Sequence, residues 1–160
     1  MTGVQTCALP ISTADVLERF DLIEAARPTR VLLMLGTNDS REHGRARGYR
    51  MATSLETERN LAALLDLIAG LGAAVTVITP TDVDQDRITA FFAGGPVRWA
   101  ASAVAETAAV VRKVAPGCVD LHTAMRASGP GDLLESDGVH PTPAGQRFIL
   151  TRIVEHLRAG

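Results

Sequence analysis

Two short runs of the sequence are almost entirely apolar: "VLLML" at residues 31–35 and "AAVTVITP" at residues 73–80. A half-exposed strand alternates apolar and polar residues, whereas an uninterrupted apolar run is typical of a parallel strand covered on both faces. Parallel neighbours need a crossover connection, which is usually a helix. The two runs therefore predict a sheet whose strands alternate with helices, and we expect both faces of each strand to be buried.

Helix signals occur at the positions that such an alternation requires. Ser12 or Thr13 is a suitable N-cap for a first helix, which Pro28 ends. Thr53 and Glu56 have the spacing of a capping box, and apolar residues at helical spacing follow them: Leu61, Leu64, Leu65 and Ile68. A second helix therefore lies between the two apolar runs.

The rest of the chain continues the pattern. A segment rich in Asp, Gly and Pro, residues 81–97, reads as a loop, and a helix is expected over residues 98–114. The short strand "CVDL" at residues 118–121 comes next, and a last helix begins at Pro143 after an N-cap at Thr142. The order predicts a doubly wound α/β fold in one domain, with only three visible strands.

Composition excludes several classes of protein. Hydrophobic residues make up 46% and charged residues 21% of the 160 residues, which are ordinary globular values. The formal net charge of −2 gives no basic field for nucleic acid, and no apolar run approaches the roughly 18 residues of a membrane span. The two cysteines, Cys7 and Cys118, show no metal-ligand spacing, so we expect neither a metal nor another cofactor. No export signal is visible, and the compartment and the oligomeric state stay open.

Two loops that follow predicted strands carry chemically useful residues. In "SDGVHPTPAGQ", Asp137 and His140 are three residues apart, so the carboxylate can accept a hydrogen bond from one ring nitrogen while the other faces outward. A histidine titrates near neutral pH and can act as a general base. In "LGTNDS", Asn38 offers an amide N–H as an oxyanion donor, and Gly36 allows a close backbone approach.

These motifs resemble a known family. "LGTND" is similar to the third conserved block, and "DGVHPTPAG" to the fifth, of the SGNH or GDSL-type esterases and lipases. "TADVLERF" and "ETERNLAALLDLIAGLGAAVTVITP" are similar to the family's segments before and after the third block, so the resemblance runs from about Thr13 to the C-terminus.

The resemblance implies a flavodoxin-like three-layer α/β/α fold and metal-free hydrolysis of small acyl, aryl or acetylated-sugar esters through an acyl-enzyme. It assigns His140 as general base, Asp137 as its partner and Asn38 as oxyanion-hole donor. Gly36, Thr37 and Asp39 are candidate substrate-binding residues by the same resemblance. A non-catalytic binding module and an acyltransferase are the alternative functions, and neither nucleic acid nor a membrane span is expected.

The chain departs from the family at its N-terminus. The GDS motif with the nucleophilic serine and the glycine of the second block are both missing. None of the serines lies in a GDS context after a strand: Ser12, Ser40, Ser54, Ser102, Ser128 and Ser136. Loss of a triad nucleophile costs on the order of 10⁶ in kcat, so we expect the chain as written to be almost inactive.

The first residues explain this departure. "TGVQTCALPI" matches a translated short-read sequencing adaptor, so we predict that residues 1–11 are a non-native leader and that residues 12–160 are a partial SGNH domain. By the family's strand order, the run at 31–35 would then form an exposed sheet edge. An apolar unpaired edge favours aggregation, so we also predict poor solubility.

Two groups of residues each allow two interpretations. Four arginines follow Asn38, and they either attract an anionic or carbohydrate substrate or belong to a solvated loop: Arg41, Arg45, Arg47 and Arg50. Phe91, Phe92 and Trp99 either line an acyl or aryl pocket or cap the core.

Overall fold

The computed structural model describes residues 11–43 and 46–159. Two strands, β1 (Arg30–Met34) and β4 (Ala74–Ile78), form a parallel pair that runs in register along its whole length. Val119 extends this sheet through one parallel bridge to Ile78. The predicted third strand is therefore reduced to a single bridge, and β1 is an edge strand within the described residues.

The predicted helices are present, and two of them start at complete capping boxes. Ser12 caps α1 (Thr13–Glu18), and Thr53 caps α3 (Ser54–Gly70). The first predicted helix is divided, because α1 ends at Glu18 and α2 (Phe20–Ala26) follows. The remaining long helices are α5 (Ala101–Val114) and α7 (Pro143–Ala159). No described helix has the length and apolar character that a membrane crossing requires.

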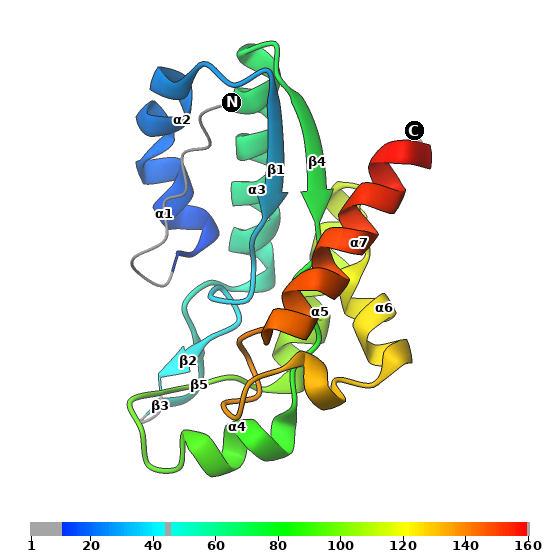
Figure 1. Ribbon diagram of the computed structural model, residues 1–160. Helices are drawn as coiled ribbons and strands as arrows, with labels where there is room; N and C mark the ends of the chain where they lie inside the picture. The colour runs from blue at the N-terminus through cyan, green and yellow to red at the C-terminus, as the bar shows by residue number, and fades with distance from the viewer. Residues whose placement is uncertain (1–10, 44–45, 160) are drawn as a thin grey trace.

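The main core lies on one face of the sheet. Leu33 of β1 and Val77 of β4 pack with Leu64 and Ile68 of α3 and with Val111 of α5. Helices α1 and α2 complete this layer on the left of the sheet in Figure 1. On the other face, α7 packs through Ile153 against Ile78 and Val119. Helices therefore lie on both faces, which gives the predicted α/β/α arrangement.

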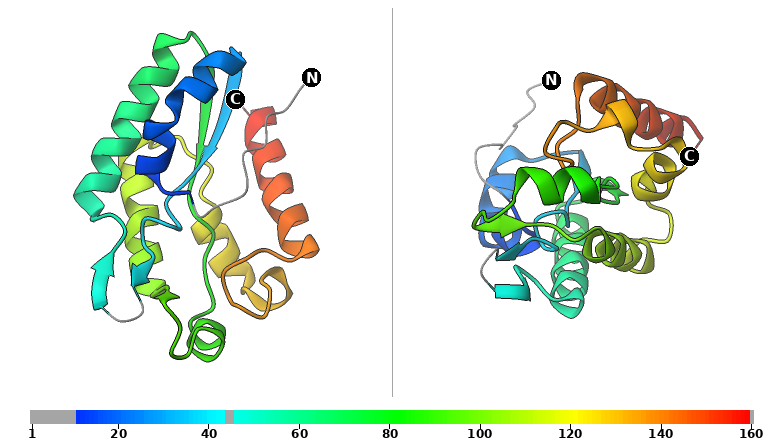
Figure 2. Two further views of the ribbon diagram at one scale, coloured as in Figure 1. Left: turned by 90° about the vertical axis from the view of Figure 1, so that its left-hand side faces the viewer. Right: turned by 90° about the horizontal axis from the view of Figure 1, so that it is seen from below.

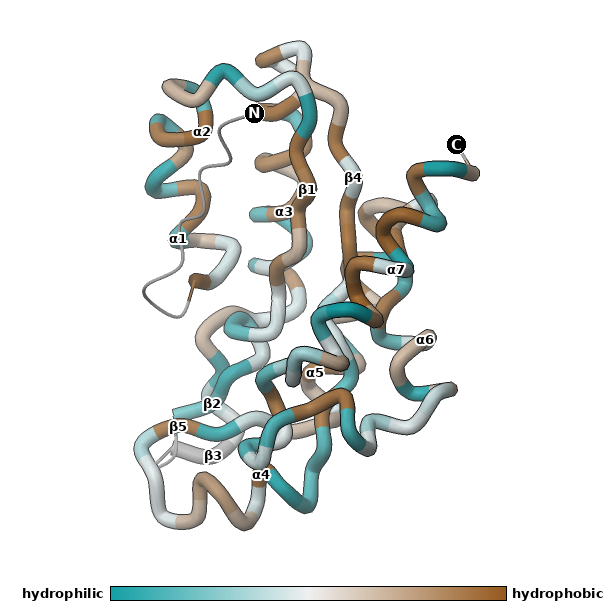
Figure 3. The backbone as a smooth tube through the Cα atoms, viewed as in Figure 1, coloured by the Kyte–Doolittle hydropathy of each residue, from teal (hydrophilic) through white to brown (hydrophobic). Residues whose placement is uncertain are grey.

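The expectation that β1 is covered on both faces is wrong. Leu32 and Met34 point away from α3, and their side chains are 51% and 38% exposed. Helix α7 reaches β4 and Val119 but not this part of β1, although β1 and β4 are hydrophobic along most of their length (Figure 3). Within the described residues β1 pairs with β4 alone, so the predicted edge is present in addition to this exposed face. The poor solubility that we derived from the edge stays a prediction.

Short elements that the sequence did not reveal surround the carboxyl end of the sheet. The loop after Asn38 forms a hairpin of β2 (Glu42–His43) and β3 (Ala46–Arg50), and β5 (Val97–Arg98) pairs with β2. The predicted loop over residues 81–97 contains α4 (Gln85–Phe91). Helix α6 (Leu121–Ser128) and a 3₁₀ turn (Gly131–Leu133) precede α7.

All of the candidate site segments lie near one end of the molecule. Figure 1 shows the small antiparallel sheet, α4 and the start of α7 at the end toward which β1 and β4 point. Figure 2 shows the same grouping when the molecule is seen from below. In α/β sheets this carboxyl end is where ligands bind. The leader predicted for residues 1–11 lies outside the described residues except for Ile11.

Candidate active site

Asp137 and His140 form the hydrogen bond that their spacing predicts. His140 Nδ1 lies 2.6 Å from Asp137 Oδ2, and the backbone N–H groups of Val139 and His140 donate to Asp137 Oδ1 at 2.8 and 3.0 Å. The His140 side chain is 69% exposed, whereas that of Asp137 is 14% exposed. The carboxylate is therefore fixed by the backbone, and the ring is held at one nitrogen while the rest of it faces solvent.

The hydrogen bonds keep Asp137 ionised. Partial burial by itself would raise the pKa of Asp137, but the hydrogen bonds from the His140 ring and from the two backbone N–H groups outweigh it. The pKa of this carboxyl therefore lies below its ordinary value of 3.8. At neutral pH Asp137 is an anion that accepts the Nδ1 proton of His140, which leaves Nε2 free to accept another proton.

The turn after β1 is held by a buried carboxylate. Asp39 is fully buried, and its two oxygens accept hydrogen bonds from the N–H and hydroxyl of Thr13 at 3.0 and 2.5 Å and from the Thr57 hydroxyl at 3.1 Å. These partners begin α1 and lie in the first turns of α3. Asp39 thus ties the turn to two helices, and these contacts favour a positioning role over the substrate-binding role that we predicted, which stays untested.

Gly36 is required by packing at this turn. Its φ is +116°, and a Cβ atom there would lie 2.6 Å from Thr107 Cγ2 and 3.2 Å from Pro80 Cγ. A larger residue would therefore be strained in its backbone and would collide with α5. The close approach that we predicted for Gly36 occurs with the protein's own side chains.

Asn38 lies between these constrained residues and is partly buried. Its Nδ2 donates to the carbonyl oxygen of Ile11 at 3.2 Å. An asparagine amide carries two N–H groups, so one donor remains after this hydrogen bond.

Trp99 connects the two predicted site loops. Its Nε1–H donates to the carbonyl oxygen of Thr37 at 2.8 Å, and its buried ring belongs to the same apolar cluster as Val139, next to His140. Phe92 packs against this cluster, with its ring 5.3 Å from that of Trp99. Phe92 and Trp99 therefore cap a second core, whereas Phe91 is 59% exposed.

The arginine-rich segment after Asn38 is ordered by ion pairs. Arg50 lies 2.7 Å from Glu106, and Arg98 donates twice to the buried Glu42 at 2.9 and 2.6 Å. Burial alone would raise the pKa of Glu42, but the Arg98 hydrogen bonds help to hold it below the ordinary value. The segment is therefore not an irregular loop over β2 and β3, although Tyr49 is 72% exposed. Whether its arginines attract a substrate stays a prediction, and Arg45 and the Arg47 side chain lie outside the described part.

One protein-family model covers both site loops. The family model of the GDSL-like lipases and acylhydrolases matches residues 3–148. The chain belongs to the GDSL-like lipase/acylhydrolase family. No curated protein sequence matches the chain.

Solved structures share the fold of this GDSL-like chain. It superposes on acetyl xylan esterase AlAXEase with a TM-score of 0.70 and 19% identity, covering 92% of this chain and 77% of that one. The superposition on an α/β hydrolase enzyme from the metagenome of Lake Arreo has a TM-score of 0.68 and 20% sequence identity, and it covers 92% of this chain and 68% of that one. For an acetylxylan esterase from Geobacillus stearothermophilus the TM-score is 0.67 and the sequence identity 17%, and the match again covers 92% of this chain and 68% of that one.

A second histidine of this GDSL-like chain, His122, is buried and differs from His140 in this respect. His122 has a 5% exposed side chain, and its Nε2 lies 3.5 Å from Asp82 Oδ1 without a hydrogen bond among the described residues. Burial lowers the pKa of His122, although Asp82 opposes that effect. His140 combines exposure with a hydrogen-bonded carboxylate, so it is the better candidate base.

Several serine hydroxyls of the GDSL-like chain donate to groups other than a histidine ring. The hydroxyl of Ser12 donates to Asp15, that of Ser40 to the Thr37 carbonyl and that of Ser54 to Glu106. Among the described residues, no serine hydroxyl donates to a histidine ring. In the same part of the chain, no group of three or more His, Cys, Asp or Glu side chains is arranged to hold a metal ion.

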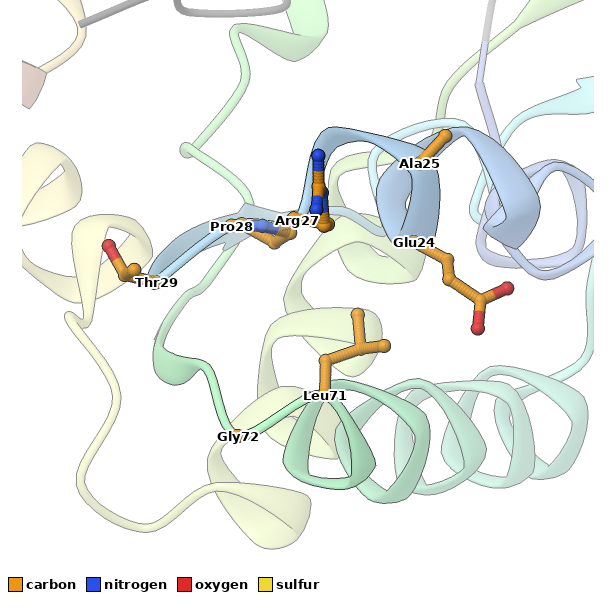
Figure 4. Close-up of a pocket in the computed structure, with 7 residues that line it drawn as sticks. All are labelled: Glu24, Ala25, Arg27, Pro28, Thr29, Leu71 and Gly72. Atoms are coloured by element: carbon orange, nitrogen blue, oxygen red, sulfur yellow. The ribbon is translucent and has the colours of Figure 1, made fainter.

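One surface pocket of the GDSL-like chain is remote from these residues. It lies at the amino end of β1, between the end of α2 and the end of α3, and Figure 4 shows Glu24 and Leu71 beside it. Pro28 and Thr29, which also line it, precede β1, whereas Asn38 follows the opposite end of that strand. We therefore place the candidate active site by its hydrogen-bonded side chains and not by this pocket.

Several supporting residues were not found from the sequence. Thr13 and Thr57 hold Asp39, Trp99 joins the two loops, and Arg87 donates to backbone carbonyls before Asp137. Their partners are 18 to 62 residues away in the sequence. The Ser12 and Thr53 caps indicated that helices start near Thr13 and Thr57, but no local pattern indicated the contacts with Asp39.

Proposed function

We propose that this chain is the C-terminal part of a serine ester hydrolase in which His140 is the general base, Asp137 orients it and Asn38 donates to the oxyanion. The observation that carries the proposal is the 2.6 Å hydrogen bond between Asp137 and an otherwise exposed His140 ring. This arrangement fixes the Nδ1 tautomer and leaves Nε2 as a proton acceptor. Membership of an esterase family supports it.

The proposed reaction uses a serine that this sequence does not contain. His140 Nε2 removes the hydroxyl proton while the serine oxygen attacks the ester carbonyl. The carbonyl oxygen becomes an oxyanion, which accepts a hydrogen bond from an N–H of Asn38. The intermediate then collapses as His140 passes the proton to the departing alcohol, which leaves the acyl group on the serine. His140 next removes a proton from a water molecule that attacks the acyl-enzyme, and it returns this proton to the serine oxygen as the acid is released.

The missing nucleophile leads to a direct expectation. The 160-residue chain should hydrolyse p-nitrophenyl acetate on the order of 10⁶-fold more slowly than the protein that carries the serine, which is the cost in kcat of removing a triad nucleophile. Addition of the native upstream segment, which we expect to encode a strand that ends in GDS, should restore turnover. Inactivity of a folded protein that carries this serine would refute the proposed function.

The role of His140 is testable in the restored protein. His140→Gln keeps the size and polarity of the side chain but removes the base, so kcat should fall by about 10³-fold or more. His156→Gln, at an exposed histidine in the last turn of α7, is the matched control and should leave kcat unchanged. Equal activities for the two variants would overturn the assignment.

For the substrate, we propose a small acyl ester, with acetylated sugars as one class. Two structural neighbours are described as acetyl xylan esterases, which supports this choice. The test compares p-nitrophenyl esters of increasing acyl length with acetylated xylo-oligosaccharides. Faster turnover of long-chain esters than of acetyl esters would contradict the proposal.

A non-catalytic binding module is the second candidate, and the absence of a GDS serine from the sequence favours it. It predicts that the native gene lacks a GDS segment upstream of the codon for Ser12. Sequencing of the native locus separates the two candidates. If ester turnover is found, product analysis with an added alcohol acceptor separates hydrolysis from acyl transfer.

A further inference from the structure

One arginine holds the backbone that leads to Asp137 and His140. Arg87, in the first turn of α4, donates from Nη1 to the Leu134 carbonyl at 2.7 Å and from Nη2 to the Gly131 carbonyl at 2.9 Å. Nη1 also lies 3.4 Å from the carbonyl oxygen of Glu135. A guanidinium presents several N–H groups in fixed directions within one plane. Arg87 can therefore hold this segment at separate points and fix its orientation as well as its position.

The guanidinium is itself fixed by Asp84, the N-cap of α4. Asp84 Oδ1 accepts hydrogen bonds from the backbone N–H groups of Asp86 and Arg87 at 3.1 and 3.0 Å. Its other oxygen lies 3.3 Å from Arg87 Nε. The carboxylate on one side and the carbonyls on the other leave the Arg87 side chain 36% exposed. Arg87 is thus oriented by its own helix before it contacts the loop.

The start of α4 also contacts the turn between Asp137 and His140. The backbone N–H of Asp84 donates to the Gly138 carbonyl at 2.9 Å. Gly138 has a φ of +75°, and a Cβ there would lie 2.6 Å from the Asp84 carbonyl oxygen and 2.9 Å from Arg87 Cβ. The turn therefore sits directly on the helix that carries Arg87.

The segment that Arg87 holds closes the turn around the pair. The N–H of Glu135 donates to the His140 carbonyl at 2.8 Å, and the N–H of Gly138 donates to the Glu135 carbonyl at 3.0 Å. Arg87 makes no hydrogen bond with the side chains of Asp137 and His140 in the described part of the chain. Any effect of Arg87 on the pair is therefore transmitted through the backbone of residues 131–138.

We propose that Arg87 is a positioning residue for the Asp137–His140 pair and that Asp84 orients it. The relevance of this role to catalysis rests on the function proposed above, whereas the effect on the geometry of the pair does not. Arg87 supplies the side-chain contacts by which α4 holds the segment before Asp137, and the backbone N–H of Asp84 supplies a further contact to Gly138.

The test is NMR spectroscopy of the 160-residue chain, without an activity assay. The amide N–H groups of Val139 and His140 donate to Asp137, so their hydrogen-exchange protection reports the geometry of the turn. The carboxyl carbon of Asp137 reports its titration midpoint. In Arg87→Met, we expect protection of the two amides to fall about tenfold or more, and the Asp137 midpoint to rise toward its ordinary value.

Two further variants keep the test specific. In Arg87→Lys, a single ammonium group replaces the guanidinium and can donate to fewer carbonyls. Both readouts should therefore lie between those of wild type and Arg87→Met. Arg112→Met is the matched control, because Arg112 is 37% exposed and pairs with Asp120 at 3.1 Å, and neither readout should change. The amides of Leu64 and Ile68 in α3 report whether each variant remains folded.

The outcomes separate the two proposals. Unchanged protection and midpoint in Arg87→Met, or equal changes in Arg112→Met, overturn the positioning role. If Arg87→Met does not fold, unchanged readouts in a folded Arg87→Lys overturn it in the same way. The expected NMR changes together with a complete absence of ester hydrolysis in the serine-containing protein would refute the proposed function alone.

Discussion

Two aspartates in the two site loops differ in almost every physical respect. Asp39 is fully buried and accepts hydrogen bonds from Thr13 and Thr57, which belong to two different helices. Asp137 is close to the surface and accepts hydrogen bonds from Val139 and His140, within three residues of itself. The origin of the donors therefore separates an aspartate that holds the fold from one that orients a neighbouring ring.

The difference predicts how far the structural effect of losing each carboxylate extends. Loss of the Asp39 carboxylate leaves buried donors of α1 and α3 without an acceptor, so the effect should reach the whole domain. Loss of the Asp137 carboxylate frees donors that are closer to water, so the effect should stay near His140. Variants in the two loops can confirm or refute this contrast.

The largest effect is expected for Asp39→Ala. It removes the acceptor of three buried hydrogen bonds, so the free energy of unfolding should fall by about 3 to 4 kcal/mol. Urea denaturation followed by circular dichroism measures it. Asp66→Ala, at an exposed position of α3, is the control and should change stability by less than about 0.5 kcal/mol. A loss below about 1 kcal/mol for Asp39→Ala would show that the carboxylate does not join the helices.

Gly138→Ala should have the next largest effect, because it disturbs the Asp137 loop by collision. Its Cβ would lie 2.6 Å from a backbone oxygen of α4, whereas Gly129 has a similar φ of +77° and no neighbour within 4 Å. Gly129→Ala therefore isolates the cost of the backbone conformation, about 1 kcal/mol. We expect Gly138→Ala to cost about 2 to 3 kcal/mol in the same denaturation measurement. Equal losses would mean that the loop moves away from α4 without cost.

The contrast between the two aspartates was not visible in the sequence. The spacing of Asp137 and His140 predicted their hydrogen bond because both partners lie in one turn. The donors to Asp39 are 26 and 18 residues away, so no spacing predicted them, and the family resemblance made Asp39 a candidate substrate-binding residue instead. Short-range side-chain pairs can be predicted from the sequence, whereas partners brought together by helix packing cannot.

The same distinction applies to the elements of the fold. The helix α3 has a capping box and a long apolar stripe, and β1 and β4 are apolar except at Arg30 and Thr76, so their existence was predicted. The short elements α4, β2 and β5 have too few residues for a periodic pattern, and β2 is stabilised by the Glu42–Arg98 ion pair across 56 residues. The exposed face of β1 was missed because an apolar run does not show what covers it.

Asp137→Asn should have a smaller and pH-dependent effect. The pKa of Asp137 is lower in the folded chain than its ordinary 3.8, so its ionisation stabilises the fold above about that pH. This contribution is lost as the pH falls through the lower folded value. We therefore expect Asp137→Asn to cost about 1 kcal/mol at pH 7 and progressively less in acid below pH 3.8. Denaturation of both proteins across this range measures the difference, and a gap that widens in acid would contradict the assigned sign.

Trp99→Phe should have an effect on stability as small as that of Asp137→Asn at neutral pH, and it tests whether the two loops are coupled. The substitution removes the Nε1–H that donates to Thr37 but keeps an aromatic ring against Val139, so we expect a loss of about 1 kcal/mol. Hydrogen exchange should then increase at Ser40 in one loop and at Val139 in the other, because Trp99 donates to Thr37 in the first loop and belongs to the same apolar cluster as Val139 in the second. Tyr49→Phe, which removes a hydroxyl from a 72% exposed side chain, should change neither. Faster exchange at Ser40 alone would show that the loops are held independently, and the site would then consist of two separately positioned halves.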